Sequence, residues 1–418
     1  MSELSYLEKL MDGVEVEWKA VGDIAGYSTT KVDADKLDAT SFVGVDNLLA
    51  DKGGRIDATY QPNTARLTAY EPGDILLGNI RPYLKKVWMA ENNGGCSGDV
   101  LAIRILADCK KIISPEYLYY ALSSDSFFSY SMQHAKGAKM PRGSKDAILN
   151  YQIPIPCPSA PEKSLAIQSE IVRILDKFTA LTAELTAELT AELTMRKKQY
   201  NYYRDQLLSF NTEDVPHLPM GQKDIGEFIR GGTFQKKDFI DAGVGCIHYG
   251  QIYTYYGTYT EKTKTYISTA LAKKCKKAQK GDLIIATTSE NDEDVCKAVA
   301  WLGSEDIAVS SDACIYKHNL NPKYVSYFFQ TEQFQNQKRQ YITGAKVRRV
   351  NADNLSKILI PVPSMEIQER IVSILDKFDT LTNSITEGLP REIELRQKQY
   401  EYYRDLLFSF PKPETASN

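Results

Sequence analysis

One stretch of this chain occurs twice, and the repetition constrains the fold more than any other feature. Residues 167–210 recur 200 positions later as residues 367–410, without a gap and with 25 of 44 positions identical. Both copies keep an Ile-Leu-Asp-Lys-Phe run near the start and a Tyr-Tyr-Arg-Asp run near the end. Internal repeats must be read before local structure because they define the whole architecture. The sequence therefore predicts a tandem protein that preserves one element in each half.

Both copies are expected to be long helices. Apolar residues of the first copy recur in steps of three, four and seven, which places them on one face of a helix. Between Thr182 and Leu193 the sequence Thr-Ala-Glu-Leu occurs three times, without glycine or proline. A helix from Ser164 to Phe210 would be about 70 Å long, too long to bury its own apolar stripe. We expect the second copy to pack against it, with a kink or break near Pro390, which removes an N–H donor.

Composition indicates a soluble globular chain. Of the 418 residues, 43% are hydrophobic, and no apolar run approaches the roughly 18 residues of a membrane span. The first residues lack the pattern of a signal peptide, so a cytoplasmic location is expected. The seven cysteines are scattered and odd in number, which favours reduced thiols over a metal site. The net charge of −3 is weak evidence against nucleic-acid binding, so any DNA-binding surface must be local.

The blocks that precede the two helices share an outline but little sequence. Each block contains an apolar strand after a turn with Gly-Asp, a helix that begins at proline, a basic loop with glycine, and a closing Ile-Pro-x-Pro strand. In the first block these features are at 72–77, 114–117, 136–145 and 153–156, and in the second at 280–285, 321–324, 343–349 and 360–363. One element of the tandem is thus preserved, whereas the other varies.

This layout resembles the specificity subunits of type I restriction-modification systems, and the Thr-Ala-Glu-Leu repeats are typical of one subgroup. The resemblance implies an α+β protein in which two globular target-recognition domains are separated by two long antiparallel helices, a coiled coil with pseudo-twofold symmetry. The implied segments are recognition domains 1–163 and 211–363, spacer helices 164–210 (repeats at 182–193) and 364–410, and a C-terminal tail 411–418. It also implies that the chain itself is not an enzyme.

Candidate DNA-contacting residues lie in the basic loops and in the stretch from Asn79 to Lys86. A glycine lets the backbone approach a phosphate, and arginine can bond a guanine edge with two hydrogen bonds. The candidates are Arg81, Tyr83, Lys85, Lys139, Arg142, Lys346, Arg348 and Arg349. A solvated basic turn remains the alternative for the loops, and an ordinary hairpin for the stretch that contains Arg81.

The ends of the two helices carry matching aromatic and basic residues, which suggests that they dock two copies of one partner. The candidates are Arg196, Tyr200, Tyr203, Arg204, Arg396, Tyr400, Tyr403 and Arg404. The resemblance implies that this partner is a modification subunit that binds S-adenosylmethionine, with motor-nuclease subunits that use ATP and Mg²⁺ joining for cleavage. No cofactor is expected on the chain itself. The alternative is that these tyrosines only seal the helix pair.

Searches for catalytic motifs find none. The chain lacks a Gly-x-x-x-x-Gly-Lys-Ser/Thr phosphate loop, and the carboxylate run from Glu290 to Asp294 has the composition of a solvated acidic turn. The helices are then interpreted as a spacer between two DNA half-sites. Two alternatives stay open: a stand-alone DNA methyltransferase or nuclease, and a purely structural tandem scaffold.

Overall fold

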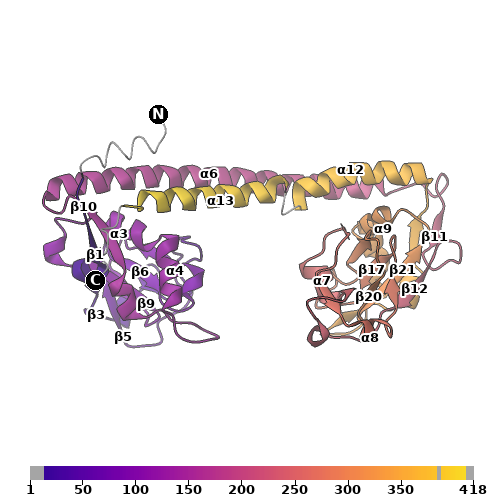
Figure 1. Ribbon diagram of the computed structural model, residues 1–418, viewed down its shortest axis with the longest axis horizontal. Coiled ribbons are helices and arrows are strands. Elements are labelled where there is room, and N and C mark those ends of the chain that lie inside the picture. Colours follow the sequence, from indigo (N-terminus) through magenta and orange to yellow (C-terminus); the bar gives the residue numbers. More distant parts are fainter. Residues whose placement is uncertain (1–13, 384–386, 411–418) are drawn as a thin grey trace. The chain divides into compact units, whose positions relative to one another are not determined.

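The computed structural model describes residues 14–383 and 387–410 (Figure 1). The predicted tail 411–418 and residues 1–13 lie outside the described residues. The chain divides into two compact units, Met1–Ala187 with Glu394–Asn418, and Glu188–Ile393. Each unit therefore combines one block with part of both repeated helical regions.

Unit 1 is built on two four-stranded sheets and a two-stranded ribbon. The sheets have strand orders β2-β9-β6-β7 and β3-β5-β8-β4, and the ribbon is β1-β10. The strands are β1 (Val16–Ala20), β2 (Ala25–Tyr27), β3 (Lys31–Asp33), β4 (Phe42–Val43), β5 (Arg66–Tyr70), β6 (Ile75–Gly78), β7 (Val87–Met89), β8 (Gly94–Cys96), β9 (Val100–Ile105) and β10 (Gln152–Pro156). The helices are α2 (Val21–Ile24), η1 (Ala34–Lys36), η2 (Pro82–Leu84), η3 (Ala107–Cys109), α3 (Pro115–Leu122), α4 (Asp125–Gln133) and α5 (Lys145–Asn150).

Unit 2 repeats this plan with additions. Its sheets have orders β12-β21-β17-β19-β14 and β15-β13-β20-β16, with two-stranded pairs β11-β23 and β18-β22. The strands are β11 (His217–Pro219), β12 (Gly226–Arg230), β13 (Val244–Ile247), β14 (Tyr259–Thr260), β15 (Thr265–Ile267), β16 (Lys277–Ala278), β17 (Leu283–Ala286), β18 (Thr288–Ser289), β19 (Ala298–Trp301), β20 (Ile307–Val309), β21 (Ala313–His318), β22 (Arg348–Arg349) and β23 (Leu359–Pro361). The helices are η4 (Lys236–Asp238), α7 (Tyr249–Thr254), α8 (Thr269–Ala272), α9 (Pro322–Phe328), α10 (Glu332–Arg339) and α11 (Ala352–Leu355).

The repeated stretches form the long helices that the sequence predicts. The first copy is a single helix of 47 residues, α6 (Pro161–Leu207), which contains the Thr-Ala-Glu-Leu repeats. The second copy is broken into α12 (Met365–Asn383) and α13 (Gly388–Leu407). Gly388 has φ of +77°, and Pro390 sits in the first turn of α13, where its missing N–H costs nothing. The predicted break near Pro390 is confirmed.

Matching contacts join the helices inside each unit. In unit 1 the rings of Phe178 and Tyr403 stack with centroids 5.5 Å apart, and in unit 2 those of Tyr203 and Phe378 stack at 5.8 Å. The two pairs are equivalent, because Phe378 is the repeat partner of Phe178 and Tyr203 is that of Tyr403. In unit 1 the helices run antiparallel, because Thr179, one residue after Phe178, bonds Tyr400 at 2.7 Å. Figure 1 shows α6 and α13 side by side there.

A repeated glutamine attaches each block to its helix. Gln168 Oε1 accepts from the backbone N–H of Ser114 at 3.0 Å, and Gln368 Oε1 accepts from that of Asn321 at 2.9 Å. Ser114 and Asn321 are the N-caps of α3 and α9, so the predicted helix starts are confirmed. Both glutamines are fully buried, and so each block docks on its helix through the same hydrogen bond.

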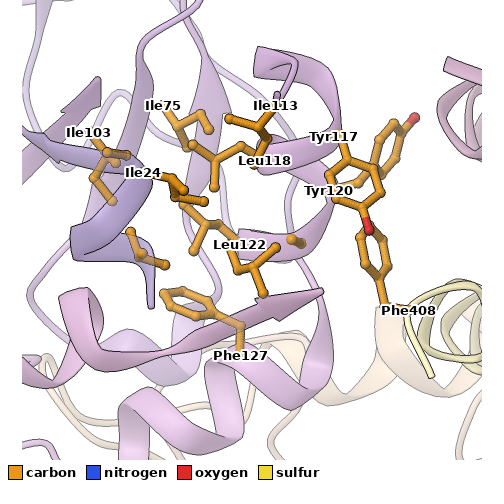
Figure 2. Close-up of a cluster of buried hydrophobic side chains, with 14 of the residues drawn as sticks. Ile24, Ile75, Ile103, Ile113, Tyr117, Leu118, Tyr120, Leu122, Phe127 and Phe408 are labelled. Carbon is orange, nitrogen blue, oxygen red and sulfur yellow. The ribbon is translucent and has the colours of Figure 1, made fainter. Parts of the chain in front are cut away.

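The core of each unit includes apolar residues of the repeated helices. In unit 1, Ile171 and Leu175 of α6 join the cluster shown in Figure 2, where Phe408 packs against Tyr117 of α3 with ring centroids 5.1 Å apart. In unit 2, Ile371 and Leu375 of α12 occupy the corresponding positions. The apolar stripe of the helices is therefore buried partly against the blocks, and not only against the other helix.

Replacing Gln368 with methionine is expected to destabilise unit 2. The change leaves the Asn321 N–H and the Pro363 carbonyl without their partner inside a buried site, which costs about 1–3 kcal/mol. Urea unfolding should show this loss for Gln368→Met, and a change within about 0.5 kcal/mol for the exposed control Gln206→Met. Equal stability of both variants would show that this bond does not hold the block.

Candidate nucleic-acid interface

The two basic loops that the sequence singled out are closed in the same way. In unit 1, Lys136 and Arg142 exchange backbone hydrogen bonds of 2.9 and 2.8 Å, and in unit 2, Thr343 and Arg349 exchange two of 2.9 Å. Each loop turns at a glycine with positive φ, which is +105° at Gly137 and +92° at the corresponding glycine of unit 2. These glycines are needed because L-residues rarely adopt such φ values.

Each loop lies against the segment that follows the central strand of its sheet. In unit 1, Gly143 N donates to Asn79 O at 2.9 Å, and Arg81 N donates to Pro141 O at 2.7 Å. The predicted stretch with Arg81 is thus the connection of the β6–β7 hairpin, and it contacts the basic loop directly. The hairpin alternative correctly described the backbone, yet the same hairpin brings Arg81 to the loop that carries Arg142.

The matching contact in unit 2 uses a segment that sequence reasoning did not select. Val350 N donates to Thr287 O at 3.2 Å, and β18 pairs with β22, so that Thr288 lies opposite Arg349. A pocket of about 290 Å³ opens beside this pair. Its polar lining includes Arg230, Asp312 and Arg349. Thr287 N donates to Asp312 O, just as Asn79 N donates to Asp99 O in unit 1. Both aspartates end a Ser-x-Asp pattern, which could have indicated this match.

The cations of the loops fall into two groups. Lys139, Lys346 and Arg349 are exposed, and no ion pair joins them to a carboxylate within the described residues. In contrast, Arg142 is ion-paired with Asp99, and Arg348 Nε lies 2.8 Å from Asp292. The first group is free to neutralise phosphates, whereas the second is already paired.

Tyr83 and Lys85 have different surroundings, although they are two residues apart. Tyr83 is exposed on η2, where its ring is open to solvent. Lys85 Nζ instead bonds Asp125 of α4 at 2.7 Å, and that carboxylate also accepts from Lys52 at 3.1 Å. Although burial opposes ionisation, these two cations lower the pKa of Asp125 overall. Lys85 therefore anchors the hairpin connection, and its DNA contact stays a prediction.

The same network reaches the second repeated helix. Lys52 Nζ bonds Glu401 of α13 at 2.6 Å, and Glu401 also pairs with Arg404, which is buried. Burial, and then the neighbouring guanidinium of Arg404, lower the pKa of Lys52 to about 8. Arg404 is thus occupied inside unit 1 by this network of charges.

Most of the predicted docking residues at the helix ends make internal contacts. Arg204 and Tyr200 are buried, and the Tyr200 hydroxyl donates to Gln330 at 3.0 Å. With the Tyr203 and Tyr403 stacks and the Tyr400 hydroxyl bond already described, these contacts match the alternative in which the tyrosines seal the helix pair. Arg196 and Arg396 are more exposed. Arg196 bonds Glu192 and Gln199 of its own helix, and Arg396 bonds Gln399. Partner docking stays a prediction.

Neighbouring tyrosines point outward instead. Tyr202 and Tyr402 are 61% and 63% exposed. Each makes an edge contact with the next tyrosine, at 5.4 and 5.5 Å between centroids. Tyr202 and Tyr402 therefore face solvent, and Tyr203 is itself 47% exposed although its ring stacks on that of Phe378.

Two kinds of feature are not found in the part of the chain that the structure describes, namely metal-ligand clusters and membrane-spanning helices. Within residues 14–383 and 387–410, no three His, Cys, Asp or Glu side chains are grouped as metal ligands would be. All seven cysteines are free thiols, as their spacing predicts. Among the described helices, none combines the length and apolar character that a membrane span requires.

Comparison with known families decides the broader identity. Residues 72–195 and 219–395 match the family described as the type I restriction modification DNA specificity domain. The chain belongs to this family. Membership assigns it the DNA sequence-specificity role that the repeat architecture predicts, and not a catalytic one.

Full-length relatives agree with this assignment. The specificity subunit of a type I restriction enzyme of Escherichia coli is 40% identical over 430 residues, which cover all of both chains. A putative type I restriction enzyme specificity subunit of Haemophilus influenzae is 32% identical and covers 97% of this chain and 98% of its own.

Two solved structures share the fold. A chain from a structure that concerns complex assembly and conformational transition of the type I R-M system aligns with a TM-score of 0.66 at 17% identity, covering 94% of this chain and 97% of its own. The HsdS subunit from Thermoanaerobacter tengcongensis aligns with a TM-score of 0.51 at 16% identity, covering 94% and 96%. The predicted fold class, two α+β domains joined by long helices, is confirmed.

Proposed function

We propose that this member of the specificity family selects the DNA target of a type I restriction-modification assembly by reading a bipartite, asymmetric sequence. Each block would read one half-site, and the DNA between the half-sites would remain unread. The observation that carries this proposal is the pair of basic loops, which are closed by the same backbone bonds in both units. Loops with the same geometry but different side chains are suited to two different half-sites.

The loop cations support contact with DNA. Lys139 and Lys346 are exposed and have the point charges that phosphates attract, while arginine can also bond a guanine edge. Arg349 lines the polar pocket of unit 2 and is the residue there best suited to a base edge. Tyr83 offers an exposed ring two residues after Arg81, whose backbone bonds the unit 1 loop.

We further propose that the chain docks two modification subunits and, for cleavage, restriction subunits. Exposed Tyr202 and Tyr402, with Arg196 and Arg396, provide two similar surfaces on the repeated helices. Under this proposal the partners supply S-adenosylmethionine, ATP and Mg²⁺, whereas this chain binds none of them. The assembly would work in the cytoplasm, where its DNA target is found.

Sequencing of methylated bases in cells that express the chain with its partner subunits tests this function. We expect methylation at one split, asymmetric sequence, and none when this chain is omitted. Exchanging residues 211–363 for the corresponding block of a relative should change one half-site and keep the other. Methylation that ignores sequence, or that changes in both half-sites after the exchange, would contradict the proposal.

A further inference from the structure

In both units one arginine of the basic loop is bound by a carboxylate from outside the loop. Arg142 pairs with Asp99, from the turn between β8 and β9. Arg348 pairs with Asp292 at 2.8 Å, from the acidic turn between β18 and β19. Neither member of the pair occupies a corresponding position in the two units, because backbone bonding matches Asp99 with Asp312 and Arg142 with Arg349. Two dissimilar blocks thus reach the same pairing by different residues.

The acidic turn of unit 2 is exposed to solvent, as its composition predicts, and its backbone is also held in place. Lys338 of α10 is fully buried, and its Nζ donates to Glu293 O at 3.0 Å and to Val295 O at 2.9 Å. Inside the turn, Asn291 and Asp294 exchange two hydrogen bonds of 2.7 Å. An ammonium group is costly to bury, and the two hydrogen bonds to backbone carbonyls offset part of that cost.

Asp99 is held just as closely to its arginine. The Asp99 carbonyl accepts a hydrogen bond from Asn79 N at 2.8 Å. Ile80, which follows Asn79, forms a backbone bridge with Arg142. The backbone of the block therefore keeps Asp99 and Arg142 close to each other, so that their side chains can pair.

A carboxylate beside a loop guanidinium changes which DNA contacts are favourable. A phosphate must displace the carboxylate, and it is also repelled by it. A guanine edge accepts two hydrogen bonds from arginine. The amino group of the paired cytosine can donate a hydrogen bond to a carboxylate. Contacts to the phosphates of any sequence are thus disfavoured more than contacts to a matching base pair. Discrimination of this kind needs a repulsive element as well as an attractive one.

We propose that Asp99 and Asp292 are specificity-determining residues, whose carboxylates withhold Arg142 and Arg348 from the phosphates of non-target DNA. The inference rests on the proposed function, in which the loops contact DNA. Lys338 is a positioning residue, because it acts through the turn that presents Asp292.

The test measures binding of the chain, assembled with its partner subunits, to two duplexes that differ only in the half-sites. Asp99→Asn and Asp292→Asn keep the side-chain shape and remove the charge. Exposed Asp108→Asn in unit 1 and Asp224→Asn in unit 2 are controls with the same change in net charge. Relative to its control, each variant should bind the non-target duplex about two- to fivefold more tightly, as expected for loss of a partly exposed ion pair. Target affinity should change less, so the specificity ratio falls.

Asp292→Glu, which keeps the charge, should preserve the discrimination of the wild type. The inference is overturned if non-target affinity of the Asn variants equals that of the controls, or if target and non-target affinities fall together. In both cases the wild-type preference for its target would remain, and the proposed function would stand. A wild-type assembly that binds both duplexes equally would instead contradict the proposed function itself.

Discussion

Deletion of Thr186–Leu189, one Thr-Ala-Glu-Leu unit of α6, will shorten the unread DNA between the half-sites by about one base pair. Four helical residues account for about 6 Å of length and about 40° of rotation beyond a full turn. One base pair accounts for about 3.4 Å and roughly 35°. The rotations match closely and the lengths in part, so the register of the assembly on DNA should move by the nearest whole base pair. Mapping of methylated bases should show the shorter spacer and essentially no methylation of the original sequence.

The half-sites provide the internal control for this deletion. They should be unchanged, because residues 182–193 belong to α6 and to neither basic loop. The substitution Thr190→Ala keeps the helix length and should leave the spacer as it is. An altered half-site, or an unaltered spacer after the deletion, would show that α6 does not set the spacing.

Replacing both Lys346 and Arg349 with alanine will lower affinity for the target by about 10- to 100-fold. The estimate follows from losing one bidentate base contact and one phosphate contact, at about 1–3 kcal/mol for the former. The salt dependence should also weaken, because each lost phosphate contact reduces the slope of log affinity against log salt by about 0.9. Binding titrations at several salt concentrations would measure both effects.

A second double variant, at two exposed lysines outside the loop, serves as the comparison. Lys273→Ala with Lys274→Ala removes the same charge from exposed positions near α8, in the same unit. We expect at most a few-fold loss from that change, and no shift in base preference. If the two double variants weaken binding equally at every salt concentration, the loop acts only through net charge and reads no base.

The sequence was most informative where local rules and repetition agreed. Periodicity, the absence of breakers and the duplicated copy predicted α6, while Pro390 marked the break between α12 and α13. N-caps at Ser114 and Asn321 fixed two helix starts, because capping needs only near neighbours in sequence. The basic loops were recognised as a pair because each occupies the same place before the closing Ile-Pro-x-Pro strand of its block.

Contacts between distant residues could not be predicted in this way. The pairing of Arg142 with Asp99, and the clamp of Lys338 on residues 293–295, join groups more than forty residues apart. Their composition alone indicated solvated charges, which is the commoner outcome for such residues. Which side chains of the helix ends are buried also depends on where the helices meet the block and each other, and this is decided only when the tertiary fold forms.

The glutamine that seats each block has a consequence for how such proteins diversify. Gln168 and Gln368 accept a hydrogen bond from a main-chain N–H, a group that every amino acid except proline supplies. A foreign block can therefore make the same bond, provided that its helix begins at the right place and that its apolar side chains fit the buried face of the repeated helix. New DNA preferences would then arise by exchange of whole blocks between genes, with no change in the repeated helices on which the blocks pack.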